Sequence, residues 1–214
     1  MDASNADLDR IAKIAPEDWP GLFARREIAY RQGRYDEALE LYRESTRDHP
    51  GFADAMVNLA WTFEHLRRPA EALAALDNAL LTRPEFRTIH QIHTVRGQIL
   101  KRLQRNEEAL VSYDRALELH PDDPDALCGR GSALYNSGRP QEALLAFDRA
   151  IAVRPSLPPF AHFARGATLH WLGRSVDART SLSRFLELAP DHPQAPEARR
   201  MLEQIPEEEP RNAE

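Results

Sequence analysis

Proline recurs along this 214-residue chain at almost constant spacing. The steps between successive members are 34, 34, 37, 34 and 35 residues, for Pro16, Pro50, Pro84, Pro121, Pro155 and Pro190. A series of alanines has the same spacing as the last five prolines, at Ala38, Ala72, Ala109, Ala143 and Ala178. Proline ends helices whereas alanine favours them, so the shared period indicates an internal repeat. A period of 34 residues is typical of helix pairs stacked into an array.

The third unit shows the pattern within one repeat. Apolar or small residues recur with helical spacing over residues 90–103, and the pattern breaks at 104–106. It resumes over 107–119 and ends at Pro121, because proline lacks an amide donor and disfavours helix in the residue before it. Each unit is therefore predicted to be a helix, a short turn, a second helix and a longer turn.

Small residues recur where the two helices of a unit would cross. One phase of the first helix holds Gly97, Gly131 and Gly166, and one phase of the second holds Ala109, Ala143 and Ala178. A neighbouring phase of the second helix holds large residues, at Tyr42, Leu76, Tyr113, Phe147 and Leu182. Two helices approach closely only where side chains are small, so these positions predict the crossing.

This pattern resembles the tetratricopeptide repeat (TPR) family. Its marks are a small residue in the first helix, Ala near the start of the second, an aromatic residue or Leu one turn later, and a closing Pro. Segments 33–39 and 113–117 are close to the family's consensus. The resemblance implies an all-α fold, a right-handed superhelical α-solenoid of TPR helix hairpins.

The period divides the chain into five repeats, which we assign to 19–52, 53–86, 90–123, 124–157 and 159–192. Exposed apolar ends of such arrays must be covered, so we expect a tail and a lone capping helix in 1–18 and a capping helix in 193–205. Residues 206–214 are expected to form an acidic, disordered tail. Arg26 stands where the other repeats have Gly or Ala, so the first helix pair is expected to open wider.

Charged residues also keep the period. Arginines at one phase of the first helices are matched by aspartates at one phase of the second helices, at Arg25, Arg96, Arg130 and Arg165 and at Asp77, Asp114 and Asp148. They have the spacing of a ladder of ion pairs. We expect them instead to be solvated, with pairs worth about 0–1 kcal/mol.

Composition excludes several classes of protein. The formal net charge of -6 argues against a nucleic-acid partner, because neutralising phosphates requires an excess of basic residues. Cys128 is the only cysteine, which excludes an intrachain disulfide and a cysteine-based zinc site. The polar, acidic start and the absence of a long apolar stretch predict no signal peptide and no membrane insertion, hence a cytoplasmic location. The strong preference for Arg over Lys suggests a bacterial, GC-rich genome.

Motifs for catalysis are missing. The sequence has no phosphate-binding loop, no His-Glu-x-x-His and no Gly-x-Ser-x-Gly, and the repeat itself accounts for Gly131 in Gly129-Arg130-Gly131. His90 and His93 are spaced like two metal ligands, but no third ligand is predictable. We therefore predict no enzyme, no catalytic residue, no cofactor and no metal.

The resemblance implies that the first helices line a concave groove which receives a peptide or a partner helix. Carried over residue by residue, the groove should include Phe23, Glu27, Tyr30, Asp54, Trp61, His65, Gln91, Gln98, Lys101, Arg102, Tyr135, Asn136, Phe160, His170 and Trp171. Aromatic residues at both ends suit an interface, and the middle is polar and basic. We expect Trp61 and Tyr135 to contact the partner and Phe163 to pack between helices.

Some family members grip a C-terminal carboxylate with a clamp of Lys, Arg and Asn residues spread over three repeats. Asn58 matches one clamp position, but Phe23, Glu27, Gln91 and Val95 stand where the other members would be. Binding of acidic chaperone tails by that clamp is therefore not expected.

The leading hypothesis is a non-enzymatic interaction scaffold with a protein or peptide partner, with homo-oligomerisation through an end or the groove as one option. One alternative is a dedicated bacterial chaperone or adaptor for one secreted or membrane-associated client. Another is an RNA-binding helical-repeat protein, which the acidic balance disfavours. An enzyme subunit would act only in trans.

Overall fold

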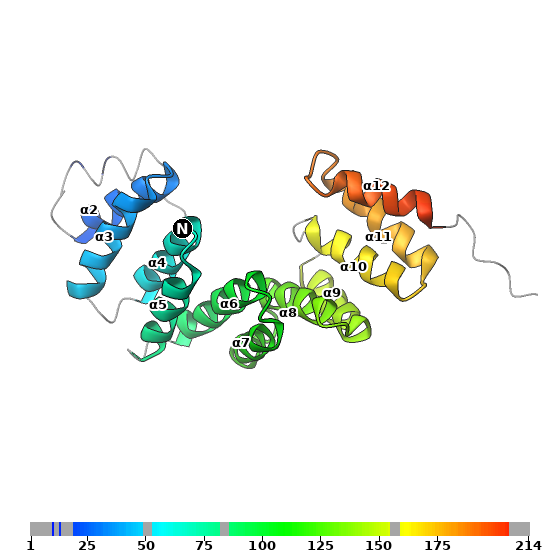
Figure 1. The fold of residues 1–214 in the computed structure, drawn as a ribbon, viewed down its shortest axis with the longest axis horizontal. Helices are drawn as coiled ribbons and strands as arrows, with labels where there is room; N and C mark the ends of the chain where they lie inside the picture. The colour runs from blue at the N-terminus through cyan, green and yellow to red at the C-terminus, as the bar shows by residue number, and fades with distance from the viewer. Residues whose placement is uncertain are drawn as a thin grey trace, which may run out of the picture. The chain divides into compact units, whose positions relative to one another are not determined.

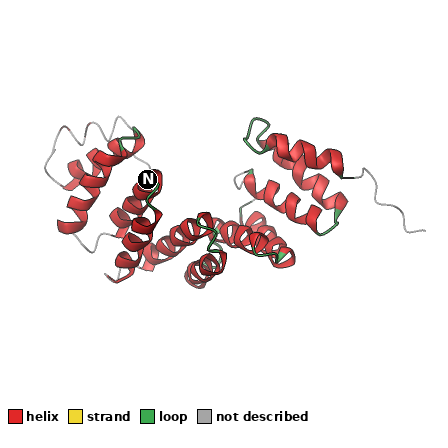
Figure 2. Cartoon of the chain, viewed as in Figure 1, coloured by secondary structure: helices red, strands yellow, loops and turns green. Residues whose placement is uncertain are grey.

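The chain forms helices joined by short turns in the computed structural model (Figures 1 and 2). The structure describes residues 10, 13, 19–48, 53–81, 86–154 and 159–205. Within these ranges there is no strand. The helices are α2 (Trp19–Arg31), α3 (Tyr35–Asp48), α4 (Ala53–His65), α5 (Pro69–Leu81), α6 (Phe86–Arg102), α7 (Asn106–Leu119), α8 (Pro124–Asn136), α9 (Pro140–Val153), α10 (Phe160–Trp171), α11 (Ser175–Leu188) and α12 (Ala195–Gln204). The predicted all-α fold of helix hairpins is confirmed.

The helices belong to two units, residues 1–99 and 100–214, and α6 contributes to both. In the first unit, α2 packs on α3, α3 on α4, and α4 on α5. In the second unit, each helix from α7 to α12 packs on the next one along the chain, and α8 also contacts α10. Each unit is thus a stack of hairpins in chain order, the arrangement that a 34-residue helical repeat predicts.

Glycines on the first helices make room for large side chains from the second helices. A Cβ atom at Gly131 would lie 2.8 Å from the ring of Phe147, and one at Gly166 would lie 2.7 Å from Leu182. Phe147 and Leu182 are themselves buried. A larger residue at either glycine would therefore separate the two helices of its hairpin, as the recurrence of small residues predicts.

Each hairpin turns through one residue in the left-handed region of φ. These residues hold one phase of the repeat, at Gly33 (φ 73°), Arg67 (59°), Gln104 (61°), Gly138 (75°) and Gly173 (72°). In every case the next residue donates its backbone N–H to the carbonyl oxygen five residues earlier, at 2.8–3.0 Å. This is the hydrogen bond of a Schellman motif, which ends the first helix and directs the chain into the second helix.

Arg26 takes the crossing position of the first hairpin. Its side chain is buried, and its guanidinium carbon lies 5.6 Å from the centre of the Tyr42 ring. Burial lowers the pKa of Arg26 and raises that of Tyr42, because each charged form loses hydration. The first hairpin therefore contains a cation in its core at the position where the later hairpins contain alanine or glycine.

Ion pairs link successive repeats. Arg96 Nε lies 2.8 Å from Asp77 Oδ1, and the same atoms of Arg130 and Asp114 are 2.7 Å apart. Arg165 Nε and Asp148 Oδ1 are 2.5 Å apart. The arginine side chains are at most 29% exposed, whereas the aspartates stay 44–54% exposed, so the ladder of ion pairs is formed and only partly shielded from water.

Helix α12 closes the C-terminal end of the second unit. Ala195, Ala198 and Ile205 form one buried cluster with Phe185 of α11. Arg179 of α11 donates to the carbonyl oxygens of Leu202 and Ile205 at 3.0 and 2.9 Å, which satisfies two acceptors at the end of α12. Of the segments expected at the two ends, 1–18 is described only at Arg10 and Lys13, and 206–214 lies outside the described residues.

Candidate functional site

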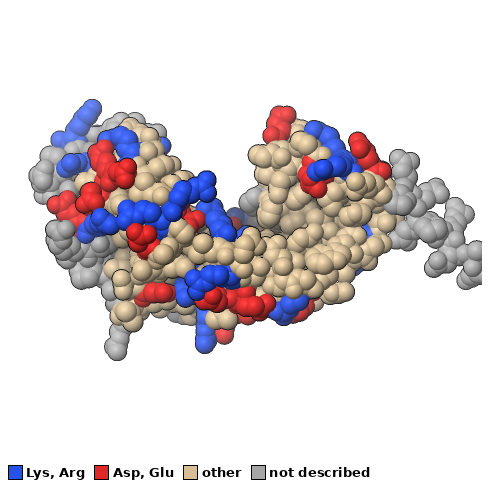
Figure 3. Space-filling view, in the orientation of Figure 1, with Lys and Arg blue, Asp and Glu red and all other residues tan. Residues whose placement is uncertain are grey.

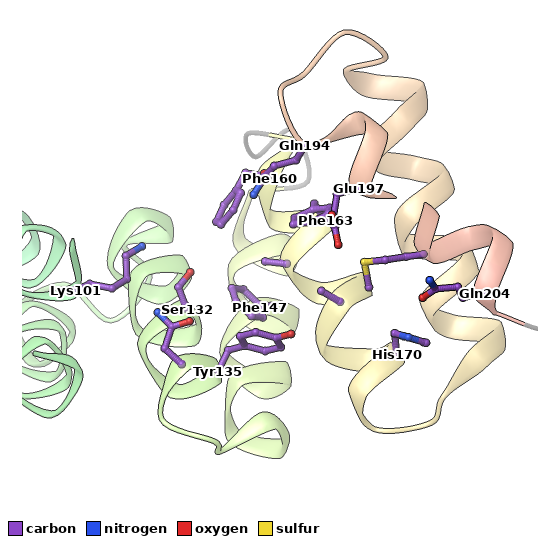
Figure 4. Close-up of a pocket in the computed structure, with 14 residues that line it drawn as sticks. Lys101, Ser132, Tyr135, Phe147, Phe160, Phe163, His170, Gln194, Glu197 and Gln204 are labelled. Atoms are coloured by element: carbon purple, nitrogen blue, oxygen red, sulfur yellow. The ribbon is translucent and has the colours of Figure 1, made fainter. Parts of the chain in front are cut away.

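A pocket of about 460 Å³ lies in the second unit among α8, α10 and α12 (Figure 4). It is lined by Lys101, Ser132, Tyr135, Asn136, Phe147, Phe160, Phe163, Ala164, Ala167, His170, Gln194, Glu197, Met201 and Gln204. Pockets that bind small ligands or side chains typically have volumes of about 300–1,000 Å³. This pocket therefore has room for several side chains of a partner.

Helical spacing brings the lining residues to one face of each helix. On α8, Ser132, Tyr135 and Asn136 are three and four residues apart, the separation of neighbours on a helix surface. The residues from α10 and α12 follow the same spacing, from Phe160 to His170 and from Gln194 to Gln204. One face of each of these helices thus becomes a wall of the pocket.

Aromatic side chains form the apolar part of the pocket. The rings of Phe160 and Phe163 have their centres 6.4 Å apart, and Phe163 lies 5.3 Å from Phe185 beneath it. Ala164 and Ala167 are small, which leaves space beside these rings. Phe163 therefore packs against α11 and also lines the pocket.

Lys101 places a half-buried ammonium group at one edge of the pocket (Figure 4). Burial, with repulsion from Arg102, lowers the pKa of Lys101, and the Cys128 side chain opposes this shift only weakly. Among the described residues, no carboxylate lies within ion-pair distance of Lys101. The pocket thus contains a cation that the rest of the described chain does not neutralise.

Two other polar side chains of the pocket are engaged within the chain. Ser132 Oγ donates to the carbonyl oxygen of Cys128 at 2.9 Å, and Glu197 pairs with Arg200. Gln194 Oε1 is buried and has no hydrogen-bond partner within the described ranges. A buried amide oxygen of this kind favours a ligand that brings a donor.

Five residues of the predicted groove meet in this pocket: Lys101, Tyr135, Asn136, Phe160 and His170. Two others of the same part of the chain do not line it. Trp171 is 51% exposed and stands edge-on to Tyr135, with ring centres 4.9 Å apart, so it extends the rim. Arg102 is exposed at the end of α6.

The predicted groove residues of the first unit make a different cluster. Tyr30 Oη and His65 Nε2 lie 3.0 Å apart, and the His65 ring stacks on Tyr35 with centres 4.4 Å apart. Glu27 pairs with Arg31 on the same helix at 2.8 Å. These side chains therefore join α2, α3 and α4 to one another.

The remaining predicted residues of the first unit are spread over α2, α4 and α6. Trp61 and Gln98 are half-buried, and Gln91 is exposed. The side chains of Phe23 and Asp54 lie outside the described part of the structure. Their role in binding stays a prediction.

Sequence reasoning missed the α12 wall of the pocket. Gln194, Glu197, Met201 and Gln204 follow the last repeat, so a groove carried over from the first helices of repeats does not include them. The signal was present in the amphipathic pattern of 197–205, which was interpreted only as an end cap. Phe147 was assigned to the core, and its ring also reaches the pocket.

The chemistry of the site fits reversible binding. Burial and the nearby Asp125 raise the pKa of the Cys128 thiol to about 12, so the thiol stays protonated at neutral pH and is a poor nucleophile. No group of three or more His, Cys, Asp and Glu side chains in the described residues is arranged to hold a metal ion.

Figure 3 shows both acidic and basic side chains on the visible surface of each unit. None of the described helices combines the length and the apolar character needed to cross a bilayer.

Comparison with known proteins bears on the family and the fold. The tetratricopeptide repeat model matches residues 27–86, 94–159 and 134–193. Protein O-mannosyl-transferase TMTC1 of Homo sapiens is 25% identical over 77% of the chain, which spans only 19% of that protein's length.

Two solved structures share the fold. PilW, a type IV pilus biogenesis factor, superposes with a TM-score of 0.76 at 21% identity over 90% of this chain and 87% of its own. YrrB, a TPR protein with an unusual peptide-binding site, gives a TM-score of 0.64 at 22% identity over 92% of this chain and 100% of its own. With the family model covering more than half of its residues, the chain belongs to the tetratricopeptide repeat family.

Proposed function

We propose that this chain is a non-enzymatic interaction module that binds a segment of a partner protein in the pocket among α8, α10 and α12. The observation that carries the proposal is the pocket itself, which joins an aromatic floor to a rim of polar groups. Sites that bind peptides combine apolar area with a few polar groups that fix orientation. The family, and the peptide-binding site of its member YrrB, support the same kind of partner.

A protein partner is favoured over a nucleic acid by charge. The chain carries a formal net charge of -6, whereas nucleic-acid affinity depends on releasing counterions from phosphates with basic side chains. A few buried aromatic contacts are enough for a micromolar complex, which needs about 8 kcal/mol.

The test is a random-peptide library displayed against the full chain and against Ala167→Phe. Ala167 lines the pocket and is half-buried, so a phenylalanine there fills the space beside Phe163. We expect the wild type to enrich peptides that Ala167→Phe does not retain.

The matched control is Val111→Phe, because Val111 is 62% exposed on α7 and lies outside the pocket. It adds the same ring to the surface and should retain the enriched peptides. Peptides that bind the wild type and Ala167→Phe equally would show that the pocket is not the binding site.

A further inference from the structure

We propose that the partner segment carries a carboxylate side chain that pairs with Lys101, next to an apolar side chain that enters the space between Phe160 and Met201. This inference rests on the proposed function and names the chemistry of the partner. Lys101 does not occupy a position of the carboxylate clamp known in the family, so this pairing is distinct from that clamp.

The first argument is the isolation of the Lys101 charge. Several other cations of the same unit have anionic partners: Arg105 pairs with Glu108 at 2.6 Å, and Arg130 and Arg165 pair with aspartates. The charged or titratable groups that act on Lys101 are Arg102 and the Cys128 thiol, and neither is an anion at neutral pH. Within the described ranges, Lys101 therefore lacks a negatively charged partner, and a ligand could supply one.

The second argument is the environment of that charge. Partial burial removes some of the water around the ammonium group, and the lowered pKa of Lys101 reflects this loss. A carboxylate would restore charge-assisted hydrogen bonds, which are shorter and stronger than those between neutral groups. Attraction between opposite charges is also stronger beside apolar walls than in bulk water.

The third argument is the distribution of charge across the pocket. In Figure 4, Lys101 lies on the α6 side and Glu197 on the α12 side, with aromatic rings in between. Glu197 is already paired with Arg200, so its charge is compensated without a cation from the ligand. The complementary segment therefore has an anion at the α6 side and an apolar group over the rings.

The experiment repeats the library selection with the full chain carrying Lys101→Glu or Lys101→Met. The wild type should enrich peptides with Asp or Glu near a large apolar residue. Lys101→Met should lose the acidic preference, and Lys101→Glu should enrich Lys or Arg instead. An acidic peptide from the wild-type selection should bind Lys101→Glu about tenfold or more weakly, as expected for a charged hydrogen bond.

The matched control is Arg154→Glu, which makes the same change in net charge at an exposed residue outside the pocket. It should keep the acidic preference and change the affinity less than about threefold, the size of a screened long-range effect. Unchanged helicity and melting temperature of the Lys101 variants establish that they fold.

The outcomes separate the two proposals. Failure of the wild type to enrich any peptide over Ala167→Phe defeats the proposed function. Peptides that are lost with Ala167→Phe, but lack acidic residues or bind Lys101→Glu equally well, defeat only this inference. A wild-type dimer that Lys101→Glu dissociates would mean that a second copy occupies the pocket, which also overturns it.

Discussion

At the residue scale, the turn inside each hairpin depends on one left-handed position. Three of the five turns place glycine there, whereas the second and third use Arg67 and Gln104. A side chain in this conformation brings Cβ close to the following carbonyl oxygen, which costs about 1–2 kcal/mol. The third turn, which leads from α6 into α7, therefore holds strain that the glycine turns avoid.

Gln104→Gly should therefore stabilise the protein. Gln104 is exposed, so the substitution removes the strain without removing a packed side chain. We expect the free energy of unfolding to rise by about 1 kcal/mol in urea unfolding followed by circular dichroism, somewhat reduced by the greater freedom of glycine in the unfolded chain.

The reverse substitution, Gly138→Ala, is the control. A Cβ atom at Gly138 would meet no atom within 4 Å, so only backbone strain changes. It should lower the free energy of unfolding by about 1 kcal/mol. If both variants unfold like the wild type, the left-handed turns are not a source of strain.

At the scale of the elements, ion pairs between hairpins supplement apolar packing. Each pair joins an aspartate on a second helix to an arginine on the next first helix, as between Asp114 of α7 and Arg130 of α8. Half-buried pairs lose less to screening by water than exposed ones do. At the junction between the first and second repeats, Arg43 of α3 stands at the position of the aspartate. Its guanidinium carbon lies 5.8 Å from the ring centre of Phe63 on α4.

A double-mutant cycle on Asp114→Asn and Arg130→Met measures this contribution. We expect a coupling of about 1 kcal/mol, near the upper end for partly exposed pairs because Arg130 is only 29% exposed. Both variants keep the size of the side chain, so the cycle reports mainly the charge interaction.

The comparison cycle uses Arg115 and Glu118, which pair three residues apart on α7 and are 62% and 60% exposed. Its coupling should be only a few tenths of a kcal/mol. Equal couplings in the two cycles would show that the links between hairpins are no stronger than pairs on one exposed helix.

The period in the sequence was sufficient to predict the helices, the turns and the helix crossings, because each repeat packs its two helices in the same way. Gly131 and Gly166 were recognised as crossing residues before their facing side chains were known. The period also placed the arginines and aspartates at the spacing of a ladder, but it could not predict how far burial would exclude water from the pairs. The period also did not predict the contact between Tyr30 and His65, because that contact depends on side-chain conformation.

At the scale of the whole molecule, the end of the array and the candidate site share one element. The inner face of α12 covers Phe185, and another face carries Glu197 and Met201 into the pocket. The repeat signal ends at residue 192, so the sequence predicted lining residues on α6, α8 and α10 and left α12 as a cap. A helix that completes both the core and the site couples local stability to binding.

Ala198→Asp should test whether binding requires α12 to be docked on α11. Ala198 is fully buried between α12 and α11, and an unpaired carboxylate there costs several kcal/mol, so α12 should detach. We expect loss of binding of peptides enriched by the wild type and faster amide hydrogen exchange in α11 and α12. Stability in a repeat array is a sum of terms between neighbours, so exchange in α2–α5 should be unchanged.

Arg199→Asp is the matched variant, because it places a carboxylate at an exposed position of the same helix. It should keep α12 docked and peptides bound, although it removes one hydrogen bond from Arg199 to the carbonyl oxygen of Pro190. Binding that survives in Ala198→Asp would remove α12 from the site. Faster exchange throughout α2–α5 in that variant would instead show that the array unfolds as one cooperative body.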